Sequence, residues 1–494
     1  MMKLNDAALA DLARADLPGE VAVPGYDRGG LAAGILHVGV GNFHRAHMAR
    51  YLGDLFAKGL DHDWAIKGAG VREADAAMRT RLEAQDWLTT AIELAPERMR
   101  ARIVGSMVDF VPVEAGHGAL IEAMADPAIR IVSLTVTEGG YYIDPATQSF
   151  DTGHADIRHD AANPDRPRTA FGAIVAALKR RREAGHPPFT GLSCDNLPGN
   201  GDILRAAVVG LAGLVDAGLA RWIDERGAFP NSMVDCIVPA TGPRELALVR
   251  ERFGIEDAAP VTHEPFRQWV IEDRFCAGRP RLEEVGVTFT ERVHDYERMK
   301  IRILNGGHAA LCYPAALLDI EPVAGAMADG RIARFFRKVE EEEIVPHVDA
   351  VPDMTPPAYL DLIESRFSNP AIVDTTRRLA FDGSNRQPKF ILPSVADGLA
   401  AGRPVEGLAL VSAAWCRYCG GATESGRPIE PNDPIWNELT ARARAARDRP
   451  EEWLGMRRIY GDLAAESRFA EAFGRWLRLI HDRGMEAALE AYSG

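Results

Sequence analysis

Gly34-Ile-Leu-His-Val-Gly-Val-Gly-Asn-Phe-His44 joins an apolar run to a Gly-x-Gly turn. The apolar run predicts a buried strand, and the helical periodicity of residues 43–60 predicts a helix directly after the turn. In such a unit Gly39 permits the tight turn, and Gly41 lets a ligand come close to the backbone. The third glycine of the usual fingerprint is absent. The strand, turn and helix together still predict a dinucleotide-binding unit.

Two further features of this region bear on the nature of the ligand. Backbone N–H groups at the start of the helix, at Asn42 and Phe43, can hold the pyrophosphate of a dinucleotide. After a second predicted strand, residues 64–71, the carboxylate of Asp75 can accept both ribose hydroxyls of NAD and would repel the 2′-phosphate of NADP. Arg72 could instead attract that phosphate. We therefore expect NAD as the cofactor, with NADP as the alternative.

Short apolar runs alternate with helical patterns over the first 290 residues or so, which predicts an α/β domain. Two later runs, residues 131–137 and 189–194, are predicted strands that end at polar residues, where open α/β sheets bind ligands. From about residue 290 onward strand signals nearly vanish and long amphipathic stretches follow. The expected architecture is a Rossmann-type dinucleotide-binding domain over residues 1–288 and a mostly α-helical substrate domain over residues 289–494.

The composition restricts the class of protein. The 494 residues carry a formal net charge of −14, and 47% are hydrophobic and 26% charged. Such an acidic chain lacks the basic face that nucleic acid or an anionic membrane requires. No apolar run reaches the roughly 18 residues that span a bilayer, and the N-terminus lacks the apolar core of a signal peptide. We expect a cytoplasmic protein without a nucleic-acid, membrane or obligate protein partner.

Six cysteines in so long a chain do not suggest a disulfide framework. Cys416 and Cys419 form a single Cys-x-x-Cys pair, and no second pair has the spacing of a zinc site. A redox pair is one interpretation, and two core thiols on one helix face are the simpler one. We therefore expect no metal.

A second motif with chemical potential is Lys300-Ile-Arg-Ile-Leu-Asn305-Gly-Gly-His308. On one α-helix at about 100° per residue, Asn305 would lie about 140° and His308 about 80° around from Lys300. The amine, amide and imidazole would then share one broad face and could surround the hydroxyl of a bound alcohol, with Lys300 as proton acceptor. The alternative is a solvated lysine, followed by an asparagine that caps a helix broken at the Gly-Gly pair.

Several motifs together resemble those of the mannitol dehydrogenase family, the polyol-specific long-chain dehydrogenases and reductases. They occur in family order at residues 39–47, 133–141, 193–198, 229–235, 264–273, 300–308, 366–370 and 382–384. The motifs are spread over nearly the whole chain. The resemblance implies a Rossmann-type domain joined to a helical substrate domain, with the active site between them. The implied reaction is metal-independent oxidation of a secondary alcohol of a sugar alcohol, with hydride transfer to NAD.

The resemblance also implies roles for residues that match the family motifs. Lys300 would be the general acid–base. Asn196 and Asn305 would hold the alkoxide-like oxygen, and His308 would position substrate hydroxyls. Glu138 would gate a water chain between the lysine and solvent. A free lysine has a pKa near 10.4, so burial beside the positive ring of NAD⁺ would have to lower the pKa of Lys300 toward the working pH.

On the substrate side, the resemblance places three residues against the polyol, namely Asp235, Arg378 and Arg386. Arg386 stands where the family has a lysine, which keeps the charge but changes the hydrogen-bond geometry. At the ribose turn Ala74 precedes Asp75, whereas the family often has two acidic residues there. Selectivity for NAD over NADP is therefore less secure than in the family pattern.

Some of these residues have simpler structural interpretations. Glu138 could be a strand-end carboxylate that faces water, and Asn196 could belong to the turn before Pro198. Asp235 could cap or orient neighbouring groups. These interpretations compete with the catalytic ones for each residue taken alone.

The leading functional hypothesis is NAD-dependent oxidation of D-mannitol to D-fructose, possible also for D-arabinitol or D-sorbitol. The alternative within the family is a fructuronate reductase, whose carboxylate substrate would favour the cationic side chains of Arg378 and Arg386. The segments that begin at Glu138 and Asn196 look more like the polyol branch. A hypothesis of another class is a nucleotide-binding regulatory protein that senses redox state without turnover. The intact Lys300 motif argues against it, because a sensor needs no acid–base group.

Overall fold

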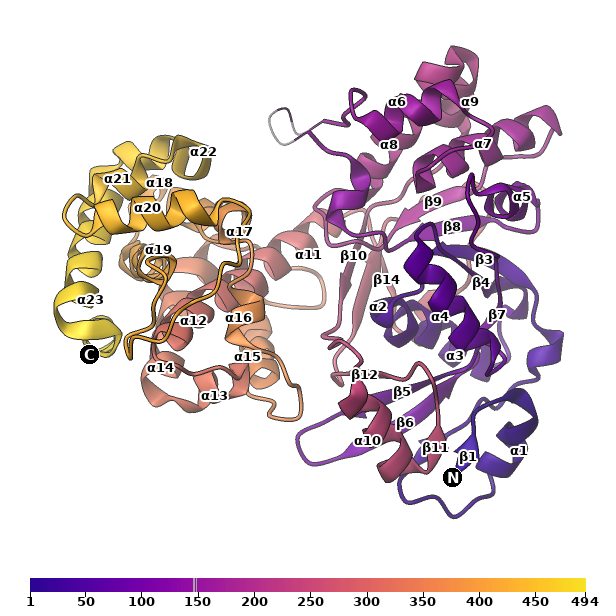
Figure 1. Cartoon of the computed structure of the whole chain (residues 1–494), viewed down its shortest axis with the longest axis horizontal. Helices are drawn as coiled ribbons and strands as arrows, with labels where there is room; N and C mark the ends of the chain where they lie inside the picture. Colours follow the sequence, from indigo (N-terminus) through magenta and orange to yellow (C-terminus); the bar gives the residue numbers. More distant parts are fainter. Residues whose placement is uncertain (145–146, 148) are drawn as a thin grey trace. The chain divides into compact units, whose positions relative to one another are not determined.

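The computed structural model describes residues 1–144, 147 and 149–494. The chain divides into two compact units, Met1–His294 and Asp295–Gly494, and Figure 1 labels the elements of each. The predicted domain boundary at residues 288–289 lies close to this division. No helix in the described part of the chain is long and apolar enough to cross a membrane.

A parallel five-stranded sheet forms the centre of the first unit. Its strands, in spatial order, are β7 (Met107–Phe110), β4 (Ala65–Ala69), β3 (Ala33–Val38), β8 (Ile131–Leu134) and β9 (Thr190–Ser193). Strands β8 and β9 are buried throughout, as their apolar sequences predict for strands covered on both faces. The chain proceeds outward from β3 to β4 and β7, and then returns to add β8 and β9 on the other side. This order confirms the predicted Rossmann-type fold, whose ligands bind at the carboxyl ends of the strands beside the reversal.

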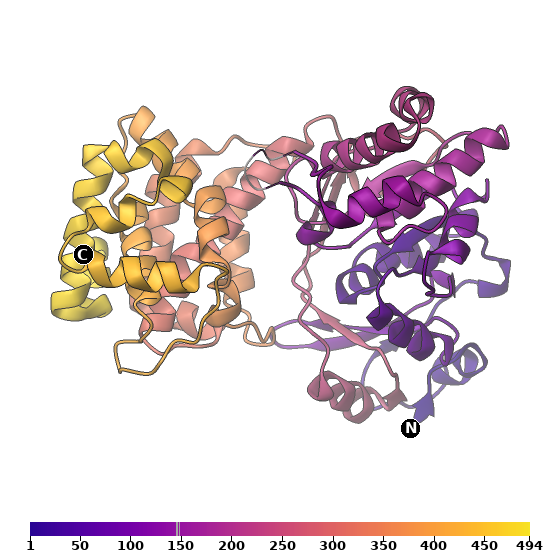
Figure 2. The same cartoon turned by 45° about the horizontal axis from the view of Figure 1, so that its top comes forward.

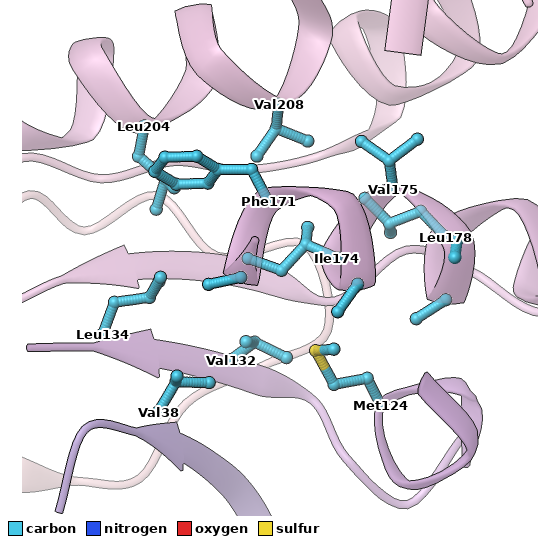
Figure 3. Close-up of a cluster of buried hydrophobic side chains, with 14 of the residues drawn as sticks. Val38, Met124, Val132, Leu134, Phe171, Ile174, Val175, Leu178, Leu204 and Val208 are labelled. Carbon is cyan, nitrogen blue, oxygen red and sulfur yellow. The ribbon is translucent and has the colours of Figure 1, made fainter. Parts of the chain in front are cut away.

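Helices α7 (Ala170–Glu183) and α8 (Asn200–Val215) cover one face of this sheet in layers that pack on each other, and α8 also contacts strand β9 directly. Figure 3 shows Phe171 and Ile174 of α7 between Leu134 of the sheet and Leu204 of α8. Burial of side chains of this size contributes roughly 1.5–3 kcal/mol each. The layers therefore fix the strands whose ends carry the candidate site.

The predicted helix over residues 43–60 is interrupted. It consists of α2 (Asn42–Ala46) and α3 (Met48–Ala57), and His47 between them has φ −115° and ψ −89°. The Nε2 atom of His47 lies 2.9 Å from the carbonyl oxygen of Gln268. The helical periodicity was a correct signal, but this long-range contact breaks the helix at His47.

Smaller sheets complete the first unit. The four-stranded sheet has the order β12 (Val261–His263), β5 (Thr89–Leu94), β6 (Met99–Val104) and β2 (Val21–Ala22). The three-stranded sheet has the order β10 (Ser232–Asp235), β13 (Gln268–Ile271) and β14 (Thr288–Phe289). Strand β10 ends at Asp235, one of the residues that the sequence analysis expects against the polyol.

The second unit is built from helices joined by loops, as Figures 1 and 2 show. Its core contains α12 (Gly306–Leu317), α14 (Gly330–Val339), α19 (Glu406–Cys419) and α23 (Ser467–Ser493). Helix α19 is buried along nearly its whole length and packs against the other three. Cys416 and Cys419 are buried, unlinked thiols of this helix, which confirms the simpler interpretation of the pair. The helical nature of this half is also confirmed.

Candidate active site

The Gly-x-Gly turn after β3 has the geometry that a dinucleotide requires. Gly39 has φ +99°, and a Cβ atom there would lie 2.2 Å from the carbonyl oxygen of Thr135. Gly41 precedes α2, and a Cβ atom there would meet nothing nearer than 3.8 Å. The first glycine is therefore required by the fold, whereas the second leaves open space beside the backbone. A phosphate group can approach the backbone N–H groups through that space.

Asn42 and Phe43 use their side chains within the protein. The Nδ2 atom of Asn42 donates to the carbonyl oxygen of Pro239 at 3.1 Å and to Oγ1 of Thr241 at 2.9 Å. The ring of Phe43 stacks on His47 at a centroid distance of 4.7 Å. These contacts brace the first turn of α2, so we expect both residues to serve a cofactor through their backbone N–H groups.

Asp75 lies in the first helical turn after β4, where the ribose of a dinucleotide is expected. Its Oδ2 atom accepts hydrogen bonds from the backbone N–H groups of Val71 at 3.0 Å and Arg72 at 2.9 Å. It thereby caps α4 (Glu73–Glu83). The side chain of Arg72 is 67% exposed and approaches Oδ1 of Asp75 at 3.7 Å. Glu73 is exposed in the same turn and is a second carboxylate that the sequence analysis did not weigh.

Two buried imidazoles are stacked behind the nucleotide turn. His37 and His44 have ring centroids 3.6 Å apart and an interplanar angle of 14°. His37 bridges the ends of two strands, with Nδ1 2.8 Å from Oγ of Ser133 and Nε2 3.0 Å from Oγ1 of Thr135. Neither ring nitrogen of His44 has a hydrogen-bond partner among the described residues, and a cavity of about 10 Å³ borders its ring. Burial lowers the pKa of His37 to about 3 and the pKa of His44 well below its usual value, so both rings are neutral.

We expect the substitution His44→Phe to make the fold less sensitive to acid. An unfolded histidine binds a proton near pH 6.5, whereas the buried neutral ring does not. The free energy of unfolding therefore falls as the pH drops below about 6.5, and each such ring adds at most about 1.4 kcal/mol per pH unit to that loss. Phenylalanine keeps a stacked ring and removes one titrating group. Urea unfolding at about pH 7 and about pH 5.5 tests this: the variant should lose less stability than the wild type, and equal losses would contradict the prediction.

Asp195 joins the ends of β8 and β9. Its carboxylate accepts hydrogen bonds from the backbone N–H groups of Val136 at 3.0 Å and Thr137 at 2.9 Å, and from the hydroxyl of Tyr141 at 2.8 Å. Burial raises the pKa of Asp195, although these hydrogen bonds act to lower it. The turn that it holds presents Glu138 at the surface, and the residue after it is the exposed Asn196. The sequence analysis named Glu138 and Asn196 but missed the aspartate that fixes both at one edge of the sheet.

Asn200 extends this edge to β10. Its Nδ2 atom donates to the carbonyl oxygens of Asp195 at 3.1 Å and Ser232 at 2.8 Å, and its Oδ1 atom accepts from the N–H group of Ser232 at 2.9 Å. Asp235, which is 5% exposed, ends the same strand opposite Gln268. The first unit therefore ties the Asn196 loop to the strand of Asp235.

Lys300 opens a π-helical turn, η6 (Lys300–Asn305), between α11 (Val293–Met299) and α12. The N–H group of Gly306 bonds to the carbonyl oxygen of Ile301, five residues back. The angles expected from α-helical spacing are therefore wrong for this segment, because a π-turn holds more residues per turn. Lys300 is only 8% exposed, which rules out the solvated lysine of the simpler interpretation. Such π-turns are frequent at functional sites.

Asn305 and His308 follow on the same segment. The Oδ1 atom of Asn305 is buried without a hydrogen-bond partner among the described residues. The half-buried ring of His308 lies flat on Phe367 of α15 (Pro356–Phe367), with centroids 4.2 Å apart and an interplanar angle of 13°. The segment thus presents an amide and an oriented imidazole after the buried lysine.

Gly306 and Gly307 begin α12 and do not break a helix. A Cβ atom at Gly307 would lie 2.8 Å from the ring of Phe336 and 2.9 Å from Oε1 of Glu340. Glu340 opens a second π-turn, η7 (Glu340–Ile344), and burial raises the pKa of its carboxyl well above the usual value. The second glycine is therefore needed for the close approach of α12 to Phe336 of α14 and Glu340 of η7. Helix α12 continues through Pro314 and ends at Leu317.

The two expected substrate arginines have different surroundings. Arg378 of α16 (Thr376–Leu379) forms two hydrogen bonds with Asp374, Nε to Oδ1 at 2.5 Å and Nη2 to Oδ2. Burial would raise the pKa of Asp374, but Arg378 and, to a smaller extent, His308 lower it. Arg386 donates to the carbonyl oxygen of Leu379 at 3.0 Å and so supports the end of α16. The sequence analysis missed Asp374, which lies just before the N-cap residue Thr375 of α16, four residues from Arg378.

In the described part of the chain, no three His, Cys, Asp or Glu side chains come together in an arrangement that could hold a metal ion. Within the first unit, Asp195 and Asn200 link the turn of Glu138, the loop of Asn196 and the strand that ends at Asp235. Within the second, Lys300, Asn305 and His308 follow one another along η6 and α12, and α16, which carries Arg378, packs against α12.

Known proteins resemble the chain over its whole length. The model of the mannitol dehydrogenase Rossmann domain matches residues 33–284, and that of the mannitol dehydrogenase C-terminal domain matches residues 292–480. A mannitol 2-dehydrogenase of Cereibacter sphaeroides is 63% identical over 472 residues, which cover 96% of this chain and 98% of the relative. A mannitol 2-dehydrogenase of Aspergillus oryzae is 40% identical over 498 residues and 99% of each chain.

Two solved structures agree with this result. Pseudomonas fluorescens mannitol 2-dehydrogenase, in a ternary complex with NAD and D-mannitol, matches with a TM-score of 0.88 and 39% identity over 99% of each chain. A D-sorbitol dehydrogenase in substrate-free form matches with a TM-score of 0.89 and 35% identity over 99% of this chain and all of the other. The chain belongs to the mannitol dehydrogenase family.

Proposed function

We propose that the chain oxidises D-mannitol to D-fructose, with NAD⁺ as the hydride acceptor. Its family membership makes it an NAD-dependent polyol dehydrogenase. The observation that carries the more specific proposal is the buried Lys300 on a π-turn, followed by Asn305 and His308, in a chain 63% identical to a mannitol 2-dehydrogenase.

The nucleotide turn fits NAD by its shape. The open space at Gly41 admits a pyrophosphate to the first N–H groups of α2, and Asp75 and Glu73 offer carboxylates for the ribose hydroxyls. Bound NAD⁺ supplies the acceptor for the hydride that leaves the carbinol carbon. NADP is the weaker alternative, because the guanidinium of Arg72 could attract its 2′-phosphate.

In the proposed mechanism the neutral amine of Lys300 accepts the proton of the substrate hydroxyl. The amide Nδ2 groups of Asn196 and Asn305 donate hydrogen bonds to the same oxygen, on which negative charge develops. The Oδ1 atom of Asn305 is buried, an orientation that leaves Nδ2 as the donor toward substrate. His308, held flat on Phe367, positions a neighbouring hydroxyl.

Glu138 is proposed to pass the proton from Lys300 to solvent through water. It is exposed on a turn that Asp195 holds by two backbone N–H groups. Asp235 is proposed to accept a hydrogen bond from a polyol hydroxyl. Both roles use carboxylates whose supporting elements are fixed by the fold.

The surroundings of the arginines favour an uncharged substrate over a sugar acid. Arg378 shares its charge with Asp374, and Arg386 donates to a main-chain carbonyl. The alternative function, fructuronate reduction, would use these guanidinium groups for the substrate carboxylate. The likeness to a D-sorbitol dehydrogenase supports D-sorbitol as a further substrate. We include D-arabinitol because it is also an uncharged polyol.

Formation of NADH by the purified protein tests the proposal. D-mannitol, D-sorbitol, D-arabinitol and D-mannonate are supplied in turn with NAD⁺ or NADP⁺, in the presence of EDTA. We expect reduction of NAD⁺ by D-mannitol that EDTA does not inhibit. Turnover of D-mannonate alone would favour fructuronate reductase. Binding of NADH without turnover of any substrate would favour the sensor.

A further inference from the structure

We propose that Asp374 makes the substrate subsite around Arg378 selective for uncharged polyols, because its carboxylate cancels the guanidinium charge. The sequence analysis gave Asp374 no role. The inference rests on the proposed polyol oxidation and adds to it the residue that excludes polyhydroxy carboxylates.

In the pair of Asp374 and Arg378, the anion is buried and held in place, and the cation is exposed. Asp374 is 8% exposed, and its Oδ1 atom also accepts a hydrogen bond from the N–H group of Thr375 at 2.8 Å. The side chain of Arg378, by contrast, is 61% exposed. The carboxylate is therefore held from the protein side, while the guanidinium faces outward with its remaining donors.

Those remaining donors suit hydroxyl groups. A guanidinium has five N–H donors, and the Nε and Nη2 bonds to Asp374 use two of them. The others can donate to polyol oxygens without disturbing the pair. A substrate carboxylate that binds at the free Nη edge would meet a guanidinium whose charge Asp374 already cancels. It would gain little net attraction there and would lie close to a second carboxylate.

Asp374 also influences the second substrate-positioning residue. His308 is among the groups that act electrostatically on Asp374, and α16 packs against α12, which carries His308. Asp374 thus bonds to Arg378 and lies within electrostatic range of His308. This position explains how a single residue can set the charge of the subsite.

A double-mutant cycle that removes the charges of Asp374 and Arg378 in turn tests the inference. The measured quantity is the ratio of the competitive inhibition constant of D-mannonate to the KM of D-mannitol, at one pH and ionic strength. Asp374→Asn leaves an uncompensated cation, so we expect this ratio to fall about tenfold, the value of one charge-assisted hydrogen bond. Arg378→Met leaves an uncompensated anion and should raise the ratio. The double variant restores neutrality and should return the ratio close to that of the wild type.

Arg377→Met is the matched control. Arg377 is the adjacent arginine of the same helix and pairs with Glu430 at 3.1 Å, so its loss should leave the ratio unchanged. Thermal unfolding shows which variants are folded. If Asp374→Asn does not fold, the inference is tested by comparing the ratio of the wild type with that of Arg378→Met. An unchanged ratio in Arg378→Met overturns the inference.

The outcomes separate this inference from the proposed function. Absence of polyol oxidation in the wild type rejects the function itself. Normal oxidation of D-mannitol, with a ratio that stays constant through the cycle, rejects only the role of Asp374. A fall in the ratio that persists in the double variant also rejects it, because the gain would then not require Arg378.

Discussion

Lys300→Ala is expected to lower kcat for D-mannitol oxidation by about 10²–10⁴-fold, the usual contribution of a general base, and to leave the affinity for NADH unchanged. Lys300 opens the π-turn η6 and is 8% exposed. Asn305 is an amide and cannot accept the hydroxyl proton, and His308, which lies flat on Phe367, is proposed to position a neighbouring hydroxyl. The loss should therefore appear in the chemical step.

Three measurements define this result. Single-turnover kinetics should show the loss in hydride transfer, and fluorescence titration should show normal binding of NADH. A small primary amine added to the variant should restore part of the rate, since it can replace the missing base. Lys389→Ala, which removes an exposed lysine of the same unit, should behave as the wild type. Normal kcat in Lys300→Ala would place the base elsewhere, and loss of NADH binding would assign Lys300 a structural role.

The sequence predicted those parts of the fold that depend on local signals. The strand of β3 and its Gly-x-Gly turn are encoded within about ten consecutive residues, because buried parallel strands are continuously apolar and Gly39 must have positive φ. The helical second half was likewise visible in its periodicity. The family motifs then located Lys300, Asn305 and His308.

The features that the sequence did not reveal depend on contacts between distant segments. The break at His47 follows from its contact with Gln268, 221 residues away. The π-turn at Lys300 packs against the π-turn of Glu340, and no local pattern distinguishes it from an α-helix. Asp195 directly follows a predicted strand, but its hydrogen bonds to the turn after β8 depend on the neighbouring strand and are not visible in its own segment. Tertiary structure, not propensity, decides these positions.

Asn305→Ala and Asn196→Ala are each expected to lower kcat by about 10²–10³-fold, which corresponds to about 2.7–4 kcal/mol for one preorganised donor. The KM for D-mannitol should change little, because the two hydrogen bonds strengthen only as charge develops on the oxygen. Equal losses in kcat and kcat/KM are the signature of such an interaction. A larger effect on KM than on kcat would instead indicate ordinary substrate binding.

Asn305 gives the cleaner of the two tests. Its Oδ1 atom has no hydrogen-bond partner in the described part of the chain. Truncation to alanine therefore removes a buried, unsatisfied acceptor and breaks no hydrogen bond to that atom. The variant should therefore be at least as stable as the wild type, and a fall in kcat can be assigned to chemistry. Asn385→Ala is the control, because that exposed amide donates to Oδ1 of Asp382 at 2.8 Å and has no proposed role in the reaction. If both amides act on one oxygen, the fold-decrease in kcat of the double variant should differ from the product of the two single fold-decreases, because neighbouring groups couple. Strict additivity, or a normal kcat in either single variant, would show that the two amides do not share the oxygen of the reacting alcohol.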